Sequence, residues 1–189
     1  RTGTKLVYGK QYSLTGNKKC IVLHMVDIKT ATEQPLLPCD YKFSHSPQWL
    51  SEHQLLYLTT DKNRDSQLKL LDIDNKQSWL LTADYPELKH FAYANGKLAF
   101  VTGSTLYIFK LDNTNLHPFK QQALPHTASA NSRVRWLNSN RLAVHLGKTL
   151  YWYQLDGRHS QTQISSSQQL LDSQLIDDSN LVGLMGRQN

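Results

Sequence analysis

Two histidines and two arginines stand just before aromatic residues, and they are the side chains of this sequence best suited to holding a ligand. They are His45, His90, Arg133 and Arg135, and the aromatic residues that follow them are Trp49, Tyr93 and Trp136. If these segments are the inner strands of a repeated structure, the four side chains converge on its centre. Arginine and histidine gathered there would bind an anionic group. The alternative is that these side chains alternate outward into sheet packing or only solvate the centre.

No catalytic motif accompanies these residues. The sequence contains no GxSxG, no HExxH, no glycine-rich phosphate loop and no dinucleotide fingerprint. Gly103-Ser104-Thr105 fits a tight hairpin, and residues 61–65 fit a hairpin tip because they lack the glycine and the distal glutamate of a calcium loop. The eight histidines show no metal-ligand spacing. We therefore expect no enzyme activity, no cofactor and no metal.

The two cysteines leave two interpretations open. Cys20 lies inside an apolar run, and Cys39 follows Pro38, 19 positions further on. Two cysteines at this separation make neither a CxxC pair nor a zinc site. They form either one disulfide in an oxidising compartment or two unrelated thiols.

Composition and charge indicate an ordinary folded chain. It has 189 residues, of which 39% are hydrophobic and 10% aromatic, and this aromatic share favours strands. The net charge is +6, but lysine and arginine are scattered singly, whereas nucleic-acid binding requires a basic cluster. We expect no direct binding of nucleic acid. Because no run approaches the roughly 18 apolar residues of a membrane helix, and no signal peptide opens the chain, we expect contact with a membrane only through segments outside this chain.

A short apolar run that begins with leucine recurs five times. The runs begin at Leu6, Leu55, Leu98, Leu142 and Leu181, at intervals of 39 to 49 positions. A period in the forties that is built from strands is typical of the blades of a β-propeller.

Two further series keep step with the first. Four other apolar runs each end on an aspartate, at Asp27, Asp72, Asp112 and Asp156. A short carboxylate suits this place because it accepts hydrogen bonds from the N–H groups of the following turn. The aromatic residues Trp49, Tyr93 and Trp136 precede their apolar runs by five or six positions, which predicts an inner strand, a polar turn and a second strand. Asn95-Gly96 is the strongest hairpin signal among these turns.

The aromatic run Tyr151-Trp152-Tyr153 has two interpretations. It could form an exposed platform for a partner. Strand alternation favours core packing instead, with the two tyrosines on one face and Trp152 on the other, buried between blades.

One repeat, residues 46–82, carries a resemblance to a known family. It contains Ser46-Pro47-Gln48-Trp49, then Tyr57-Leu58-Thr59-Thr60-Asp61, then Leu71-Asp72-Ile73-Asp74, and it ends on Leu80-Leu81-Thr82. This pattern resembles the repeats of TolB-like propellers and of the propeller domains in the prolyl-oligopeptidase family. The chain departs from that pattern at Ser51-Glu52-His53 and Asn138-Ser139-Asn140, where Asp-Gly is usual, and at Tyr93, where Trp is usual.

The repeats predict one all-β domain over residues 1–189, a β-propeller of about four blades of four-stranded antiparallel sheet. The repeats are expected near 1–38, 39–82, 83–125 and 126–165, with a final partial repeat at 166–189. Both ends supply the same second strand of a blade, at Leu6 and at Leu181. We therefore expect a segment of a larger propeller or a partial propeller that a second copy completes, as a homodimer, more than a closed ring.

The expected function is non-catalytic binding or sensing, with a protein or a small anionic ligand as partner. The resemblance implies a periplasmic or otherwise extracytoplasmic bacterial setting. Two concrete forms are the sensor region of a membrane-anchored transcription regulator and a TolB-like protein-docking scaffold. The alternative from the enzyme class is the gating propeller of a prolyl-oligopeptidase-type serine peptidase whose catalytic domain lies outside this chain.

Overall fold

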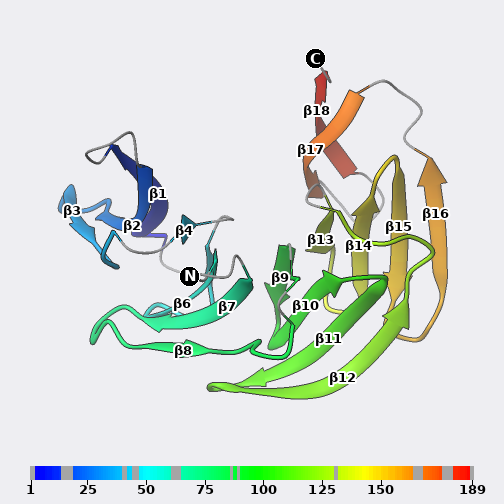
Figure 1. Ribbon diagram of the computed structural model, residues 1–189, viewed down its shortest axis with the longest axis horizontal. Coiled ribbons are helices and arrows are strands. Elements are labelled where there is room, and N and C mark those ends of the chain that lie inside the picture. The colour runs from blue at the N-terminus through cyan, green and yellow to red at the C-terminus, as the bar shows by residue number, and fades with distance from the viewer. Residues whose placement is uncertain are drawn as a thin grey trace. The chain divides into compact units, whose positions relative to one another are not determined.

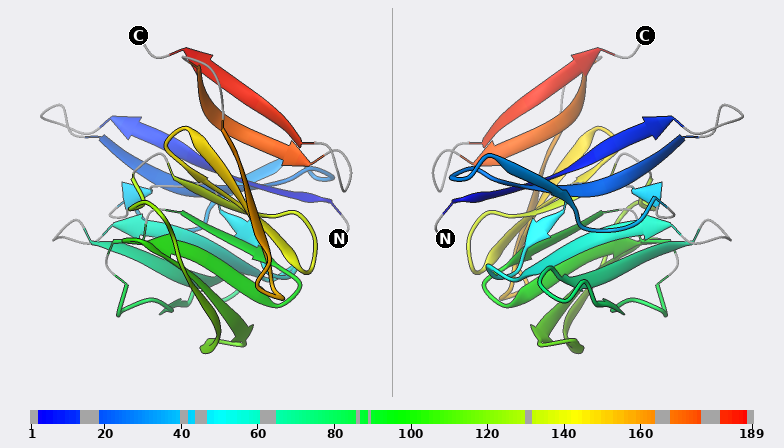
Figure 2. Two further views of the ribbon diagram at one scale, coloured as in Figure 1. Left: turned by 90° about the vertical axis from the view of Figure 1, so that its right-hand side faces the viewer. Right: turned by 90° about the vertical axis from the view of Figure 1, so that its left-hand side faces the viewer.

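The computed structural model describes residues 3–13, 19–39, 42–43, 47–60, 65–85, 87–88, 90–129, 132–163, 168–175 and 181–187. Within these ranges every regular element is a β-strand, and all neighbouring strands whose register is defined run antiparallel (Figures 1 and 2). The all-β prediction is confirmed. The chain divides into two compact units, residues 1–88 with 112–116 and residues 89–111 with 117–189.

The first unit contains two sheets. The first sheet has the order β1-β2-β3, with β1 (Lys5–Ser13), β2 (Lys19–Asp27) and β3 (Thr32–Pro35). The second has the order β4-β6-β7-β8, with β4 (Lys42–Phe43), β6 (Gln54–Thr60), β7 (Ser66–Asp72) and β8 (Ser78–Leu80). The short strand β5 (Gln48–Trp49) also pairs with β6, so two short strands share the position of the predicted inner strand.

The second unit contains two four-stranded sheets and a hairpin. One sheet comprises β9 (His90–Ala94), β10 (Lys97–Thr102), β11 (Thr105–Asp112) and β12 (Asn115–Ala123), and the next comprises β13 (Arg133–Trp136), β14 (Arg141–Leu146), β15 (Thr149–Gln154) and β16 (His159–Gln163). The hairpin pairs β17 (Gln168–Leu175) with β18 (Leu181–Arg187). Each sheet follows chain order, as in a meander, and the boundaries of a single domain over 1–189 stay a prediction.

Two-residue loops with glycine set the register of the hairpins. Asn95 and Gly96 join β9 to β10 with φ angles of 49° and 72°, which is the left-handed pair that a type I′ turn requires. Gly103, at φ 54°, opens the turn between β10 and β11, so Gly103-Ser104-Thr105 is the hairpin that the sequence predicted.

Aspartates close the turns at three of the four predicted strand ends. Asp27 Oδ1 accepts the backbone N–H of Lys29 at 2.9 Å, and Asp72 Oδ1 accepts that of Asp74 at 3.0 Å. Asp156 Oδ1 accepts the N–H of Arg158 at 3.0 Å, although β15 already ends at Gln154. The series of aspartates therefore reflects turn geometry.

A cross-strand pair of one aromatic residue and one leucine joins the inner strand to the second strand in three sheets. The pairs are Trp49 with Leu55, Tyr93 with Leu98, and Trp136 with Leu142. All three leucines are completely buried. This pairing explains why the aromatic residues and the leucine runs keep a constant spacing in the sequence.

Buried apolar side chains from facing sheets form the core of each unit. In the first unit Leu23 and Met25 of β2 pack with Leu55 and Tyr57 of β6. In the second unit Ala99 and Val101 of β10, among others, pack with residues of β13, β14 and β15.

The aromatic run on β15 follows the predicted alternation only in part. Tyr151 and Tyr153 are buried in the core of the second unit, as predicted. Trp152 is half-buried rather than buried, and the guanidinium of Arg141 lies over its ring at 5.1 Å.

The Asn95-Gly96 turn gives a test of this fold. We expect Gly96→Ala to lower the free energy of unfolding by about 1 kcal/mol, because a Cβ is disfavoured at positive φ, while no neighbouring atom lies within 4 Å to clash with it. Asn95→Gly, at the adjacent left-handed position, is the matched control and should be nearly neutral. Urea unfolding measures both variants. Equal effects of the two changes would contradict the turn assignment.

Candidate functional site

The structure brings together the strands that carry three of the four predicted ligand residues. His90 begins β9, Arg133 and Arg135 lie on β13, and the N–H of Val134 donates to His90 Nδ1 at 3.3 Å. All three predicted side chains are half-buried. Val134 lies in the core, so by strand alternation the two arginines project from the opposite face of β13. His45 lies outside the described residues, and the anion-binding role of the set stays a prediction.

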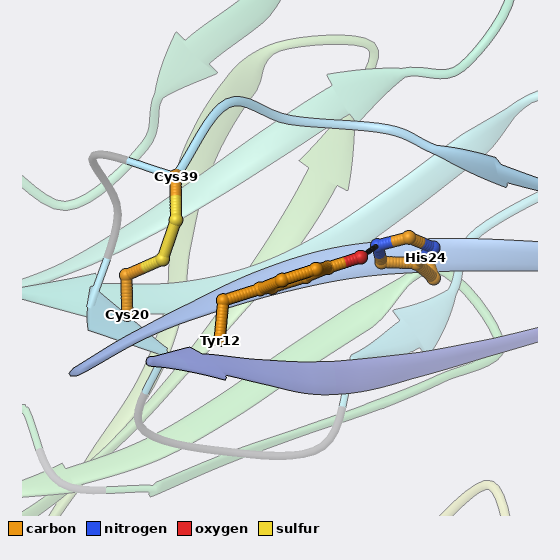
Figure 3. Close-up of a disulfide and its surroundings, with 4 residues drawn as sticks. All are labelled: Tyr12, Cys20, His24 and Cys39. Carbon is orange, nitrogen blue, oxygen red and sulfur yellow. Dashed lines mark hydrogen bonds between the residues drawn. A yellow bond between two sulfur atoms is a disulfide. The ribbon is translucent and has the colours of Figure 1, made fainter. Parts of the chain in front are cut away.

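The two cysteines form a disulfide. Cys20 on β2 is bonded to Cys39, with the two Cα atoms 5.7 Å apart (Figure 3). The sequence left open either a disulfide or two unrelated thiols, and the structure contains the disulfide.

A cavity of about 440 Å³ lies beside this disulfide in the first unit. Its lining residues are Tyr12, Val22, His24, Pro35, Leu36, Leu37, Pro38, Cys39 and Lys76. Most of these side chains are apolar, and the tyrosine hydroxyl, the imidazole and the ammonium group are the polar groups among them. Cavities of this kind, apolar with a few polar groups, are the usual form of small-molecule sites.

The register of the first sheet places the polar side chains of this region on one face. Tyr8, Lys10 and Tyr12 alternate along β1, and Tyr8 pairs directly with His24 on β2. His24 pairs with Pro35 on β3, and Glu33 lies two residues before Pro35, on the same face. The opposite face of the sheet carries Leu23 and Met25 into the core.

His24 is held between groups from all three strands of the sheet. It is only 5% exposed, and the rings of Tyr8 and Tyr12 lie 5.9 and 5.8 Å from its ring. Nε2 of His24 lies 2.8 Å from the hydroxyl of Tyr12 (Figure 3). Nδ1 lies 2.7 Å from Glu33 Oε1, an electrostatic contact whose angle does not meet hydrogen-bond geometry. An imidazole with its proton on Nδ1 suits both contacts, since Nε2 then accepts the hydroxyl proton.

Glu33 is the hub of this polar network. Its Oε1 accepts hydrogen bonds from the hydroxyl of Tyr8 at 2.7 Å and from the ammonium of Lys10 at 2.8 Å. The bond from Lys10, followed by that from Tyr8, lowers the pKa of the Glu33 carboxyl from 4.5 to about 2. The same bonds raise the pKa of Lys10 and of Tyr8. The carboxylate is therefore ionised at physiological pH and orders the side chains around His24.

The ammonium of Lys76 lies 3.5 Å from the carbonyl oxygen of Pro35, at the wall of the cavity.

In the described part of the chain, no group of three His, Cys, Asp or Glu side chains could hold a metal ion. No helix among the described residues is long and apolar enough to cross a membrane.

The sequence analysis did not predict that Tyr12, His24 and Lys76 line the same cavity. The available signals were the alternation Tyr8-x-Lys10-x-Tyr12 and a histidine inside the apolar run Cys20–Asp27. These signals identify a polar face, but the partner on β3 and the cavity wall from the turn after β7 depend on tertiary packing.

Comparison with known structures identifies the architecture. A propeller domain of the trilobed protease from Pyrococcus furiosus superposes with a TM-score of 0.61 at 12% identity, covering 90% of this chain and 57% of that one. The chain has a β-propeller fold. TolB from Acinetobacter baumannii gives 0.58 at 14% identity, covering 85% of this chain and 41% of that one. A chain in the crystal structure of a nidogen–laminin complex superposes with a TM-score of 0.60 at 7% identity. The match covers 85% of this chain and 60% of that one.

The chain spans about 41 to 60% of the length of these three structures. The predicted resemblance to TolB-like and peptidase propellers is confirmed at the level of the fold. No protein-family model matches the sequence, and no curated protein matches it.

The disulfide predicts a measurable contribution to stability. It joins residues 19 positions apart, and closing a loop of this length in the unfolded chain typically stabilises a protein by about 2–4 kcal/mol. We expect the double variant Cys20→Ser/Cys39→Ser to lose roughly this amount in urea unfolding. Dithiothreitol should lower the unfolding midpoint of the parent chain and leave the double variant unchanged. A midpoint that responds to the reductant in neither protein would contradict the bond.

The Glu33 network predicts an acid-sensitive stability. Because the folded pKa of about 2 is below the ordinary 4.5, the contribution of Glu33 is complete above pH 4.5 and is lost as the pH falls toward 2. The carboxyl resonance of Glu33 should titrate near pH 2 by NMR, and Lys10→Met should raise that midpoint. Lys148→Met, in a turn of the second unit, is the control and should leave it unchanged. A Glu33 midpoint near 4.5 in the parent chain would refute the network.

Proposed function

We propose that this protein is a non-catalytic binding or sensing propeller module whose small-molecule site is the cavity beside the Cys20–Cys39 disulfide. The observation that carries the proposal is the composition of that cavity, in which Tyr12, His24 and Lys76 bring polar groups to an otherwise apolar lining. His24 is fixed by its contacts to Tyr12 and Glu33, so the site is ordered before a ligand arrives.

The chemistry of the lining supports a small amphipathic anion as ligand. Val22, Leu36 and Leu37 offer apolar surface to an alkyl or aromatic body. The ammonium of Lys76 offers a charge-assisted hydrogen bond to a carboxylate. The hydrogen bond from Lys76 to Pro35 is long, at 3.5 Å, and therefore costs little to exchange for a ligand.

We propose a periplasmic or otherwise extracytoplasmic bacterial setting. The disulfide supports this location because such bonds persist in oxidising compartments and are rare in the cytosol. The fold shared with TolB is compatible with it.

Two larger contexts fit a binding propeller, and one enzyme context is the alternative. The first two are the sensor region of a membrane-anchored transcription regulator and a TolB-like protein-docking scaffold. The alternative is the gating propeller of a prolyl-oligopeptidase-type peptidase, which the shared fold with a protease propeller domain supports. A winged helix and a membrane segment in the gene product would support the sensor, whereas a hydrolase domain with GxSxG would support the peptidase.

A second candidate site for an anion is the pair of strands β9 and β13. His90, Arg133 and Arg135 lie on these neighbouring strands, which the hydrogen bond from Val134 to His90 joins. Two guanidinium groups on one face of a strand favour a phosphate or carboxylate group. Inorganic phosphate that perturbs the amides of β13, and not those around the cavity, would favour this site.

Octanoate is a suitable probe of the proposed ligand chemistry. We expect saturable shifts in the NMR spectrum at Tyr12, His24, Leu37 and Lys76, because the alkyl chain fills the apolar lining and the carboxylate meets the ammonium. Lys76→Gln should weaken binding at least about threefold, as expected for loss of one charge-assisted bond. Lys29→Gln, in an exposed turn, is the matched control and should bind as the parent chain does. Equal affinity of all three proteins would overturn the proposal.

A further inference from the structure

The contacts of His24 fix where the protons lie in the polar part of the cavity. Nε2 of His24 lies 2.8 Å from the hydroxyl oxygen of Tyr12 (Figure 3), and Nδ1 lies 2.7 Å from Glu33 Oε1. Glu33 is ionised, because the hydrogen bonds from Lys10 and Tyr8 lower the pKa of its carboxyl to about 2. A lone pair on Nδ1 would be repelled by this carboxylate at such a distance, so the single proton of the neutral imidazole belongs on Nδ1.

This arrangement makes the oxygen of Tyr12 a hydrogen-bond acceptor. Nε2 of the neutral His24 carries no proton, so the hydroxyl of Tyr12 donates its one proton to that nitrogen. The phenol oxygen keeps its lone pairs, and no group in the described part of the chain donates a hydrogen bond to it. The chain of carboxylate, imidazole and hydroxyl polarises the O–H bond, which strengthens the oxygen as an acceptor.

Tyr12 is also the member of this pair that a ligand reaches. Both residues line the cavity, but Tyr12 is 36% exposed whereas His24 is only 5% exposed. The two ring nitrogens of His24 already face Tyr12 and Glu33. His24 therefore acts as a positioning residue, while Tyr12 and Lys76 are the polar side chains of the lining that can contact a ligand.

The charges near the cavity determine which kind of donor suits Tyr12. Lys76 lines the cavity, and the ammonium of Lys10 lies 5.9 Å from the centre of the Tyr12 ring. Glu33 compensates one of these two positive charges through its ion pair with Lys10. An ammonium group on the ligand would be repelled by the remaining positive charge, whereas a neutral hydroxyl would not be.

We propose that the ligand of this cavity is a hydroxy acid with an apolar chain, whose hydroxyl donates a hydrogen bond to the oxygen of Tyr12 and whose carboxylate contacts the ammonium of Lys76. The proposal rests on the proposed binding function and names the ligand class for that site. Val22, Leu36 and Leu37 provide the surface for the apolar chain. A fatty acid without the hydroxyl makes one hydrogen bond fewer, so the site distinguishes the two classes through Tyr12.

The test compares octanoate with its 2-, 3- and 8-hydroxy derivatives by isothermal titration calorimetry at neutral pH. The three isomers place the hydroxyl at different distances from the carboxylate. At least one isomer should bind about two- to tenfold tighter than octanoate, as expected for one added hydrogen bond. The methyl ether of that isomer keeps the oxygen but lacks the donor, and should bind no tighter than octanoate.

Two variants assign the gain in affinity to Tyr12. Tyr12→Phe should remove the gain and leave the affinity for octanoate within about twofold of the parent value, since the apolar lining is kept. Tyr8→Phe is the matched control, because it removes a hydroxyl of the same network that lies outside the cavity lining. It should keep the preference for the hydroxy acid. Urea unfolding of both variants checks that they remain folded.

The proton positions have a measurement of their own. In the ¹⁵N NMR spectrum of the protein without ligand, His24 should have a protonated Nδ1 and an unprotonated Nε2. A proton on Nε2 would overturn the proposal, because Tyr12 would then accept a hydrogen bond from His24 and would have its own proton free for an acceptor on the ligand.

The titrations separate this proposal from the proposed binding function. If octanoate binds and none of the hydroxy acids binds tighter, the ligand class is wrong and the binding function stands. A gain that survives in Tyr12→Phe would equally overturn the role of Tyr12. Failure of all four acids to bind would overturn both the ligand class and the cavity as the binding site.

Discussion

Three of the sheets depend on one interaction, which is the cross-strand contact between an aromatic residue of the inner strand and a leucine of the second strand. Trp49, Tyr93 and Trp136 lie opposite Leu55, Leu98 and Leu142, and the leucines are completely removed from solvent. This contact holds a short strand of two to five residues in place, which backbone pairing alone would hold weakly. The indole of Trp136 adds a hydrogen bond from Nε1 to the carbonyl of Ala92, at 3.2 Å, which ties one sheet of the second unit to the next.

The first sheet lacks this contact among the described residues and is ordered by other interactions. Its core face is ordinary, with Leu23 and Met25 buried against β6. Its other face carries a polar network centred on Glu33, where one carboxylate oxygen meets Tyr8, Lys10 and His24. On this face, hydrogen bonds and ionic contacts hold the side chains in place, whereas apolar contacts do so in the other sheets. The disulfide between Cys20 and Cys39 fixes the segment after β3 beside β2, so the cavity has a rigid wall on that side.

Local turn chemistry explains why the sheets are so regular along the chain. Left-handed residues at Asn95, Gly96 and Gly103 keep the connections at two residues, so successive strands have no choice of register. Aspartates 27 and 72 fix the wider turns through their carboxylates. The turns and the leucine runs thus build the sheets, and the residues that alternate with the leucines are not needed for that role.

The sequence by itself determined the strands, the turns and the repeat, because these depend on contacts between residues that are close along the chain. The leucine runs, the aspartate series and Asn95-Gly96 all predict elements that the structure contains. The sequence could not choose between a disulfide and two thiols, and it did not bring Tyr12, His24 and Glu33 together, because their contacts join three strands and depend on the register of each pair. It also overestimated the burial of Trp152, which is half-buried in the structure. Only the tertiary structure decided these points, since it alone fixes which residues that are distant in the sequence meet on one face of a sheet.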